Sequence, residues 1–389
     1  MRFSTKVSKL SAEGAFAVLA KARELEAQGR EIVHMEIGEP DFDTPRNIIE
    51  KAHWALDHGY THYTPSAGAM EWRKSYADYL SKRYNIDLGP QNIVIMPGAK
   101  PVVFQTALAF IDEGDEVIYP DPGYPTYLSV TNFLGAKAIP MILREENDFR
   151  FDVDELKSLV SRNTKLTFIN SPQNPTGGML TQKDIETIFE LAEEYDFYIL
   201  ADDIYSRIWY EEPHFSILQV PGALKRVVVL DGHSKTYAMT GWRLGYAVCN
   251  EEVAQKLTLI MTNSNSCSAS FTQVAGAEAL HGDQTAIDDM ISMFKRRRDL
   301  IISGLNQIPG VTCKMPKGAF YAFPNVKSFG RKSQELADYL MNEAGVACLS
   351  GTAFGAYGEG YLRFSYANSL DNIEKALARM AEAFARLSA

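Results

Sequence analysis

Five short apolar runs, separated by amphipathic stretches of helical length, constrain this chain more than any other feature of its sequence. They cover residues 92–97, 116–120, 165–170, 197–202 and 226–231. Because the runs are continuously apolar, they are typical of strands buried on both faces of a parallel sheet. Strands that alternate with helices of this length indicate a doubly wound α/β fold.

The helix between the third and fourth runs is the most clearly marked. Thr181 and Asp184 resemble a capping pair at its start. The apolar side chains that follow recur at i, i+3, i+4 and i+7, and they are Ile185, Ile188, Phe189 and Ala192. This spacing predicts an amphipathic helix. A second helix is predicted over residues 11–29, with Ser11 as its N-cap and Gly29 after its last turn.

The pattern changes near residue 285, where isolated strands (317–323 and 361–366) lie among helices and a helix is predicted from 370 to 387. A chain of 389 residues also exceeds the usual size of a single hydrophobic core. We therefore expect a large α/β domain and a smaller α+β domain. The large, mostly parallel domain covers residues 46–284, and the small one combines residues 1–45 with 285–389.

Charge and composition exclude several classes of function. The net charge of −10 and the pI near 5.3 argue against nucleic-acid binding, which needs a basic surface. The one basic run, Lys295–Arg298, is interpreted as a solvated helix face. No apolar run approaches the ~18–20 residues that would span a membrane. Four widely spaced cysteines without a C-x-x-C pair predict reduced thiols and a cytoplasmic protein.

The residues that follow each apolar run carry the chemical information. In open parallel sheets, ligands bind beyond the carboxyl ends of the strands. Five successive strand ends here deliver glycine, tyrosine, asparagine, aspartate, serine and lysine to one edge of the sheet. The set suits one anionic, aromatic, carbonyl-bearing ligand. In chain order its members include Gly98, Ala99, Lys100, Tyr124, Asn174, Asp202, Tyr205, Ser234 and Lys235.

Five motifs in register identify a family. The string from Ser234 to Tyr246 (SKTYAMTGWRLGY) closely resembles the lysine motif of class I, fold type I aminotransferases of the aspartate aminotransferase type, which depend on pyridoxal 5'-phosphate (PLP). Four other motifs of that family occur in its order, at residues 38–42, 174–177, 202–205 and 362–365. The resemblance runs from about residue 30 to the C-terminus.

The resemblance implies that Lys235 carries PLP as a Schiff base and moves the proton during catalysis. A lysine must be neutral to attack an aldehyde, and burial lowers the pKa from its free value of about 10.4. The alternative is a surface loop lysine. Asp202 is implied to pair with the pyridine nitrogen; the alternative, a helix N-cap, suits Asp203 better. Tyr205 is implied to hydrogen-bond the phenolic oxygen of the cofactor.

Further cofactor contacts follow from the same resemblance. Asn174 would also bond the phenolic oxygen, although a plain turn is an alternative for this segment. Tyr124 could stack on the pyridine ring or be a surface turn residue. The phosphate would be held by the amides of Gly98, Ala99 and Lys100, by the Ser234 hydroxyl and by Arg243. Gly232 stands where many relatives carry a serine, so we expect one hydroxyl contact fewer.

The substrate contacts are implied in the same way. Arg363 would bind the α-carboxylate bidentately unless it is a surface arginine, with Gly38 and Asn174 nearby. Tyr63 matches a position that reaches the phosphate of the neighbouring subunit, which implies a homodimer with shared active sites. No metal-ligand spacing appears. His233 is interpreted as a packing or hydrogen-bonding neighbour of Lys235, and the alternative for it is a catalytic base.

The predicted reaction is transfer of the α-amino group of an L-amino acid to a 2-oxo acid, with 2-oxoglutarate as the expected acceptor, by a ping-pong mechanism. One alternative is a PLP-dependent lyase or cyclase on the same scaffold. The motifs indicate that a carbanion forms after proton abstraction, but they do not indicate which reaction follows. A more remote alternative is a non-catalytic PLP-binding module.

Overall fold

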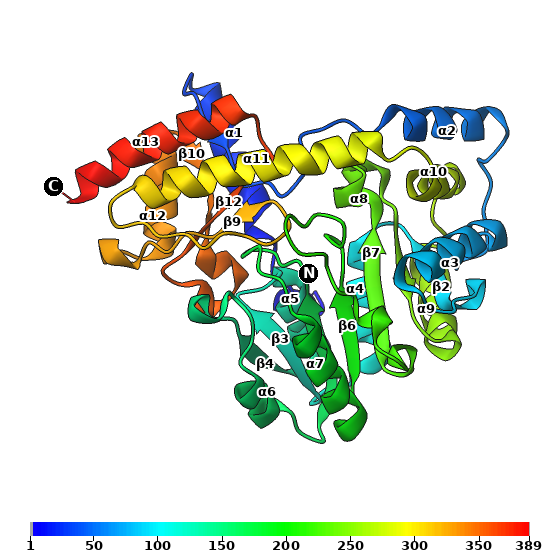
Figure 1. Cartoon of the computed structure of the whole chain (residues 1–389). Helices are drawn as coiled ribbons and strands as arrows, with labels where there is room; N and C mark the ends of the chain where they lie inside the picture. Colours follow the sequence, from blue (N-terminus) through cyan, green and yellow to red (C-terminus); the bar gives the residue numbers. More distant parts are fainter. Residues whose placement is uncertain (1–2, 389) are drawn as a thin grey trace.

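Seven strands form the central sheet of the computed structural model, which describes residues 3–388 (Figure 1). The strand order is β2-β8-β7-β6-β5-β3-β4. β8 is antiparallel to both of its neighbours, and all the other pairs are parallel. The other six strands therefore run in one direction and end at one edge. The strands are β2 Ile93–Met96, β3 Glu116–Asp121, β4 Lys137–Ile142, β5 Thr164–Asn170, β6 Tyr198–Asp202, β7 Val227–Gly232 and β8 Gly245–Val248.

The five predicted strands are confirmed as β2, β3, β5, β6 and β7. Sequence reasoning missed β4 and β8. β4 is a half-exposed edge strand that contains Pro140, which an edge tolerates because one side of the strand needs no ladder hydrogen bond. β8 spans four residues inside the lysine motif, too short a run to stand out.

Helices cover both faces of this sheet, so the doubly wound prediction is confirmed. Alternate strand side chains enter two separate cores, one shared with α4 and α9 and the other with α7 and α10. The capping box of Thr181 and Asp184 at the start of α7 is confirmed. The helices of this region are α2 Arg46–Asp57, α3 Met70–Tyr84, α4 Ala99–Phe110, α5 Pro125–Leu134, α6 Val153–Leu159, α7 Gln182–Tyr195, α8 His233–Thr236, α9 Glu251–Ser264 and α10 Ser270–His281.

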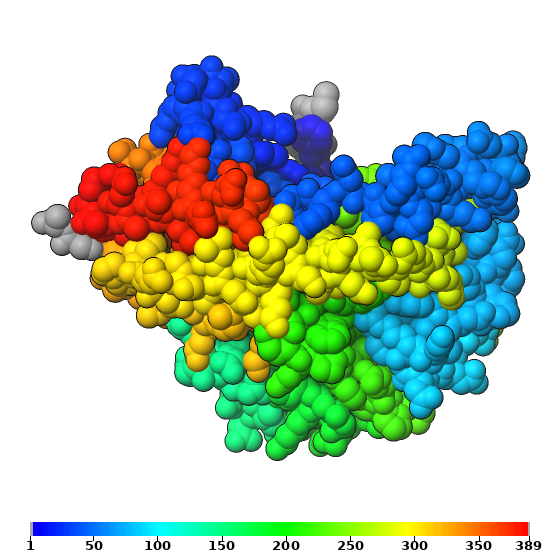
Figure 2. All heavy atoms as spheres, turned by 45° about the horizontal axis from the view of Figure 1, so that its top comes forward, coloured from blue at the N-terminus to red at the C-terminus, as the bar shows by residue number. Residues whose placement is uncertain are grey.

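The two ends of the chain meet in a separate set of elements. β1 (Val33–His34) pairs with β10 (Val346–Ala347), and β11 (Leu349–Ser350), β12 (Leu362–Ser365) and β9 (Tyr321–Ala322) form an antiparallel sheet. Figure 2 shows the N-terminal segment in blue beside the C-terminal helix in red. We propose that residues 1–45 and 285–389 form the small domain and residues 46–284 the large one. The helices are α1 Gly14–Ala27, α11 Thr285–Gln307, α12 Ser333–Tyr339 and α13 Leu370–Ser388.

The predicted N-cap of the first helix is wrong. α1 begins at Gly14, so Glu13 occupies the N-cap position. The amide of Ser11 instead donates to Ser129 Oγ on α5, at 3.0 Å. This contact spans more than a hundred residues of sequence, so a local capping rule could not have found it.

The interpretation of Lys295–Arg298 as a solvated face is wrong for two of its residues. Arg297 and Arg298 are buried on α11. Arg297 donates to both carboxylate oxygens of Asp41, at 2.6 and 2.9 Å, and Arg298 donates to Glu211. Burial is tolerated because each guanidinium has a carboxylate partner. The first pair ties the segment that contains Gly38 to α11.

Three further features bear on the predicted function classes. Within residues 3–388, no helix is long and apolar enough to cross a membrane. The same residues contain no group of three or more His, Cys, Asp or Glu side chains that could hold a metal ion. The prediction of unpaired thiols is confirmed for all four cysteines, of which Cys249, Cys313 and Cys348 are buried.

Candidate active site

A cavity of about 480 Å³ lies at the carboxyl edge of the central sheet, between that edge and the strands and loops of the two chain ends. It collects most of the side chains that the sequence singled out. Gly98 and Tyr63 do not line it. Those that do are Gly38, Ala99, Lys100, Tyr124, Asn174, Asp202, Tyr205, Ser234, Lys235, Arg243 and Arg363.

Lys235 lies on α8, the single turn that follows β7 directly. Its Nζ atom donates to the carbonyl oxygen of Gly38, at 2.5 Å. Burial lowers the pKa of Lys235 to about 8; nearby Glu39 opposes this shift and Arg363 adds to it. The alternative of a surface loop lysine is therefore wrong. The surroundings of Nζ therefore favour the neutral amine over the charged ammonium.

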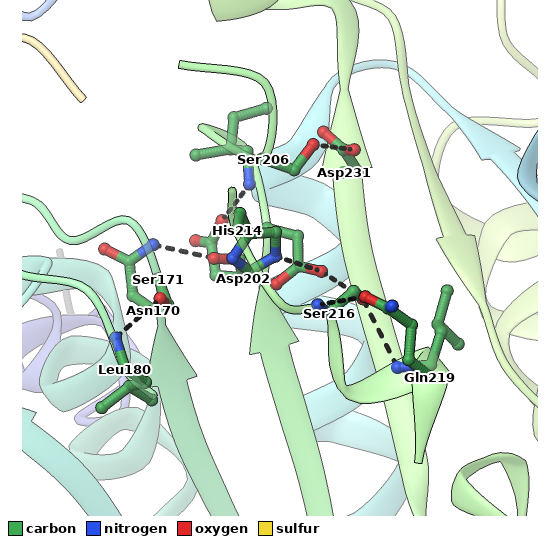
Figure 3. Close-up of polar contacts among 12 residues, drawn as sticks. Asn170, Ser171, Leu180, Asp202, Ser206, His214, Ser216, Gln219 and Asp231 are labelled. Atoms are coloured by element: carbon green, nitrogen blue, oxygen red, sulfur yellow. Dashed lines mark hydrogen bonds and ion pairs between the residues drawn. The ribbon is translucent and has the colours of Figure 1, made fainter. Parts of the chain in front are cut away.

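Asp202 ends β6 with its carboxylate at the cavity. Oδ2 accepts a hydrogen bond from the Tyr127 hydroxyl at 2.7 Å, and Oδ1 accepts one from the Ile204 amide at 3.2 Å. Burial raises the pKa of Asp202 to about 7. The Asn170 side chain donates to the Asp202 carbonyl and so joins the ends of β5 and β6 (Figure 3).

Asp203 points away from this site and does not cap a helix, contrary to expectation. No helix follows it directly. Its carboxylate accepts from the Ser216 hydroxyl at 2.7 Å and pairs with His214 at 3.2 Å. The side chains of the two adjacent aspartates therefore point to opposite sides of the sheet, because successive side chains of an extended chain alternate between its two faces.

Arg363 projects from β12 into the cavity and is buried, so it is not a surface arginine. Nη1 donates to Asn174 Oδ1 at 3.2 Å, and Nη2 donates to the Glu36 carbonyl. The guanidinium lies between the rings of Tyr321 and Phe354, at 4.6 and 4.9 Å from their centres. Burial lowers the pKa of Arg363 from its ordinary value.

The start of α4 and Arg243 meet at one end of the cavity. Gly98 precedes α4 with φ of +103°, and a Cβ atom there would lie 2.5 Å from Arg243 Nη2. Only glycine fits both the conformation and the close approach. Gly232 is also crowded, because an added Cβ would lie 3.1 Å from the Cα of Gly245. A serine side chain would not fit there without a shift.

Two tyrosines of the site escaped sequence reasoning. Tyr127 contacts Asp202, as described above. The Tyr321 hydroxyl lies 2.7 Å from the Tyr205 hydroxyl. Tyr321 lies within the predicted strand 317–323, but nothing in that strand's pattern selects it over its neighbours. Tyr127 is one helical turn after Tyr124, on α5.

The remaining predicted residues lie as follows. Tyr63 is 90% exposed, outside the cavity of its own subunit. Tyr124 is partly buried and lines the cavity, where its hydroxyl donates to Glu13 at 2.7 Å. His233 is buried and pairs with the Tyr76 hydroxyl at 3.1 Å. Burial lowers the pKa of His233 to about 4, so it remains neutral, as expected of a packing neighbour.

Two incomplete contacts test whether these residues fit PLP. No Lys, Arg or His within residues 3–388 forms an ion pair with the buried Asp202 carboxylate. A protonated pyridine nitrogen would supply the missing cation. Arg363 Nε is buried without a hydrogen-bond partner among the same residues, and a carboxylate would satisfy it. The residues present therefore fit PLP and a carboxylate substrate.

Comparisons with known proteins agree with this chemistry. The family model "Aminotransferase class I and II" matches residues 30–380. An aspartate aminotransferase of Pyrococcus horikoshii is 40% identical and covers 94% of both chains, and aromatic-amino-acid aminotransferase 2 of Thermococcus litoralis is 40% identical, covering 91% of this chain and 92% of its own. The solved structure of a Thermus thermophilus aspartate aminotransferase double mutant has a TM-score of 0.93 at 34% identity, covering 98% of this chain and 100% of its own.

The family match spans most of the chain, and relatives of the same length carry the same fold and the same type of name. The chain belongs to the class I and II aminotransferases, and it is a PLP-dependent enzyme that transfers amino groups between amino acids and 2-oxo acids.

Proposed function

We propose that Lys235, Asp202 and Arg363 carry the reaction of this aminotransferase, with an L-amino acid as donor and 2-oxoglutarate as the expected acceptor. The observation that supports the proposal is their convergence. The three side chains come from α8, the end of β6 and β12, and they line one cavity. They are a lysine of lowered pKa, a buried acid without a cationic partner and an arginine whose Nε has no hydrogen-bond partner among the described residues.

PLP, when bound, supplies an aldehyde and an electron-accepting ring. In our proposal, Asp202 holds the protonated ring nitrogen, and Asn174 and Tyr205 donate hydrogen bonds to the ring oxygen. Tyr124 contacts the ring face. The phosphate is bound by residues at the other end of the cavity, which are Ser234, Arg243 and the first amides of α4 at Gly98, Ala99 and Lys100.

The substrate is oriented by the small-domain side of the cavity. Arg363 holds the α-carboxylate with two parallel N–H groups, which a lysine could not do. The Gly38 amide is proposed to lie beside the same carboxylate. Lys235 Nζ would remove the proton from Cα of the donor and deliver it to the carbon that carried the aldehyde of the cofactor. The Gly38 carbonyl, which accepts from Nζ, keeps this amine close to the substrate.

The lowered pKa of Lys235 predicts how uptake of PLP by the apoprotein depends on pH. Only the neutral amine attacks an aldehyde, so the association rate constant should rise about tenfold per pH unit below pH ~8 and level off above it. Stopped-flow absorbance measures this rate. A profile that keeps rising to pH ~10, as for a free lysine, would show that the cavity does not neutralise the amine.

The transaminase and lyase readings differ in a single-turnover experiment. Mixed with one amino acid and no oxo acid, a transaminase should change its cofactor absorbance once, release one equivalent of oxo acid and stop. A lyase or cyclase should turn over repeatedly with the original spectrum retained. Continuous product release without an acceptor would overturn the proposed function, and a complete lack of reaction with every donor would favour the non-catalytic alternative.

We also propose a cytoplasmic homodimer with shared active sites. The exposed Tyr63 supports this proposal, because a 90% exposed tyrosine that does not line the cavity of its own subunit is available to a neighbouring one. In that assembly Tyr63 contacts the phosphate bound by the partner subunit. The four unpaired thiols suit a reducing compartment.

A further inference from the structure

Glu13 places a carboxylate inside the cavity, at the N-cap position of α1. Its side chain makes no capping hydrogen bond to its own helix. Instead, Oε1 accepts from Lys100 Nζ, from the Tyr124 hydroxyl at 2.7 Å and from the Thr126 hydroxyl at 3.4 Å. Lys100 lies on α4, Tyr124 is the N-cap of α5 and Thr126 lies in its first turn.

This carboxylate is ionised where it lies. Burial alone would raise the pKa of Glu13, but the hydrogen bonds from Lys100 and Tyr124 and the charge of Lys100 hold it below its ordinary value. The Glu13 side chain is only 24% exposed. The Lys100 side chain is 49% exposed, so Glu13 and Lys100 form a half-exposed ion pair in the lining of the cavity.

The cationic side chains of the cavity suggest a role for the ion pair between Glu13 and Lys100. Four cationic side chains line it within the described part of the chain, namely Lys100, Lys235, Arg243 and Arg363. In the proposed function the last three serve the cofactor and the α-carboxylate. The ammonium of Lys100 is left to meet a second carboxylate on the substrate, and Glu13 already occupies it.

We infer that Glu13 is a specificity-determining residue that competes with the distal carboxylate of a substrate for Lys100, and so biases donor choice toward amino acids with a single carboxylate. A dicarboxylate can bind fully only by displacing Glu13. The same cost applies to 2-oxoglutarate as acceptor. This inference rests on the proposed function and deepens it.

The test compares Glu13→Gln with wild-type holoenzyme. Glutamine keeps the size of the side chain and removes the competing charge, and Glu13 caps no helix, so the fold loses no cap. Two measurements are made: the dissociation constant of succinate, a non-reacting dicarboxylate, by calorimetry, and single-turnover efficiency with L-aspartate and L-alanine. Glu116→Gln is the matched control, because Glu116 pairs with Lys137 outside the cavity.

Removing the competing charge should tighten succinate binding about tenfold and raise the aspartate-to-alanine efficiency ratio by a similar factor. Adding Lys100→Met should abolish both gains, and Glu116→Gln should change neither. Unchanged succinate affinity and an unchanged ratio in Glu13→Gln would overturn the inference, as would equal gains in the control. If wild type converts no donor, the proposed function fails, and the succinate measurement still decides the role of Glu13.

Discussion

Replacing Lys235 by alanine should lower kcat by about 10⁴-fold, because the variant loses both the amine that binds the cofactor and the base that moves the Cα proton. Steady-state turnover with a donor and 2-oxoglutarate measures the loss. The side chain makes one hydrogen bond, to the Gly38 carbonyl, so the fold should persist. Circular dichroism of the variant verifies this.

The matched control is Lys137→Ala, which removes an exposed lysine paired with Glu116 on the far edge of the sheet. Its activity should equal that of wild type. A Lys235→Ala protein that is folded and retains more than a few per cent of wild-type turnover would contradict the role assigned to this amine.

Replacing Asp202 by asparagine should lower kcat by about 10³-fold, because the amide cannot hold the ring nitrogen protonated, which the ring needs in order to accept electrons. The change is isosteric, and the Tyr127 hydroxyl can still donate to the amide oxygen. Single-turnover absorbance separates slowed chemistry from lost cofactor. A variant with wild-type kcat would remove Asp202 from the mechanism.

Although Asp202→Asn should lower activity, it should raise the stability of the apoprotein at high pH. Burial raises the pKa of Asp202 from 3.8 to about 7, so the folded chain binds this proton more tightly than the unfolded chain. Ionising the carboxylate therefore costs stability as the pH rises through this range. Between about pH 5 and pH 8, the stability of Asp202→Asn relative to wild type should improve by about 3 kcal/mol.

Urea unfolding of both apoproteins at the two pH values measures this difference. Glu116→Gln serves as the control, because the Glu116 carboxylate has an ordinary ionic partner and should give no such gain at high pH. An unchanged difference between Asp202→Asn and wild type would mean that Asp202 is not destabilised by burial, and that the cavity needs no pyridinium to complete it.

The parts of the fold that the sequence predicted are those defined by local patterns. The buried strands carry continuous apolar runs, α7 carries its own capping box, and the residues at the strand ends follow those runs directly. Parallel pairing then brings the strand ends to one edge by geometry alone. The sequence alone therefore places Lys235 and Asp202 in one site.

The parts that escaped prediction depend on contacts between distant segments. Ser11 bonds Ser129, Arg297 bonds Asp41, and Glu13 reaches Lys100, each across more than eighty residues of sequence. Such pairs leave no periodic signal, because neither partner constrains its own neighbours. For the same reason Arg297 was indistinguishable from a solvated arginine in a charged run.

The central claim is a covalent bond between PLP and the amine of Lys235. Borohydride reduction of the PLP-loaded wild-type protein, followed by proteolysis and mass spectrometry, tests it most directly. The reduced cofactor should be found on the peptide that contains Lys235, at one equivalent per chain, and on no other lysine. Label on Lys100 or another lysine, or no label on a protein that retains PLP, would contradict the account.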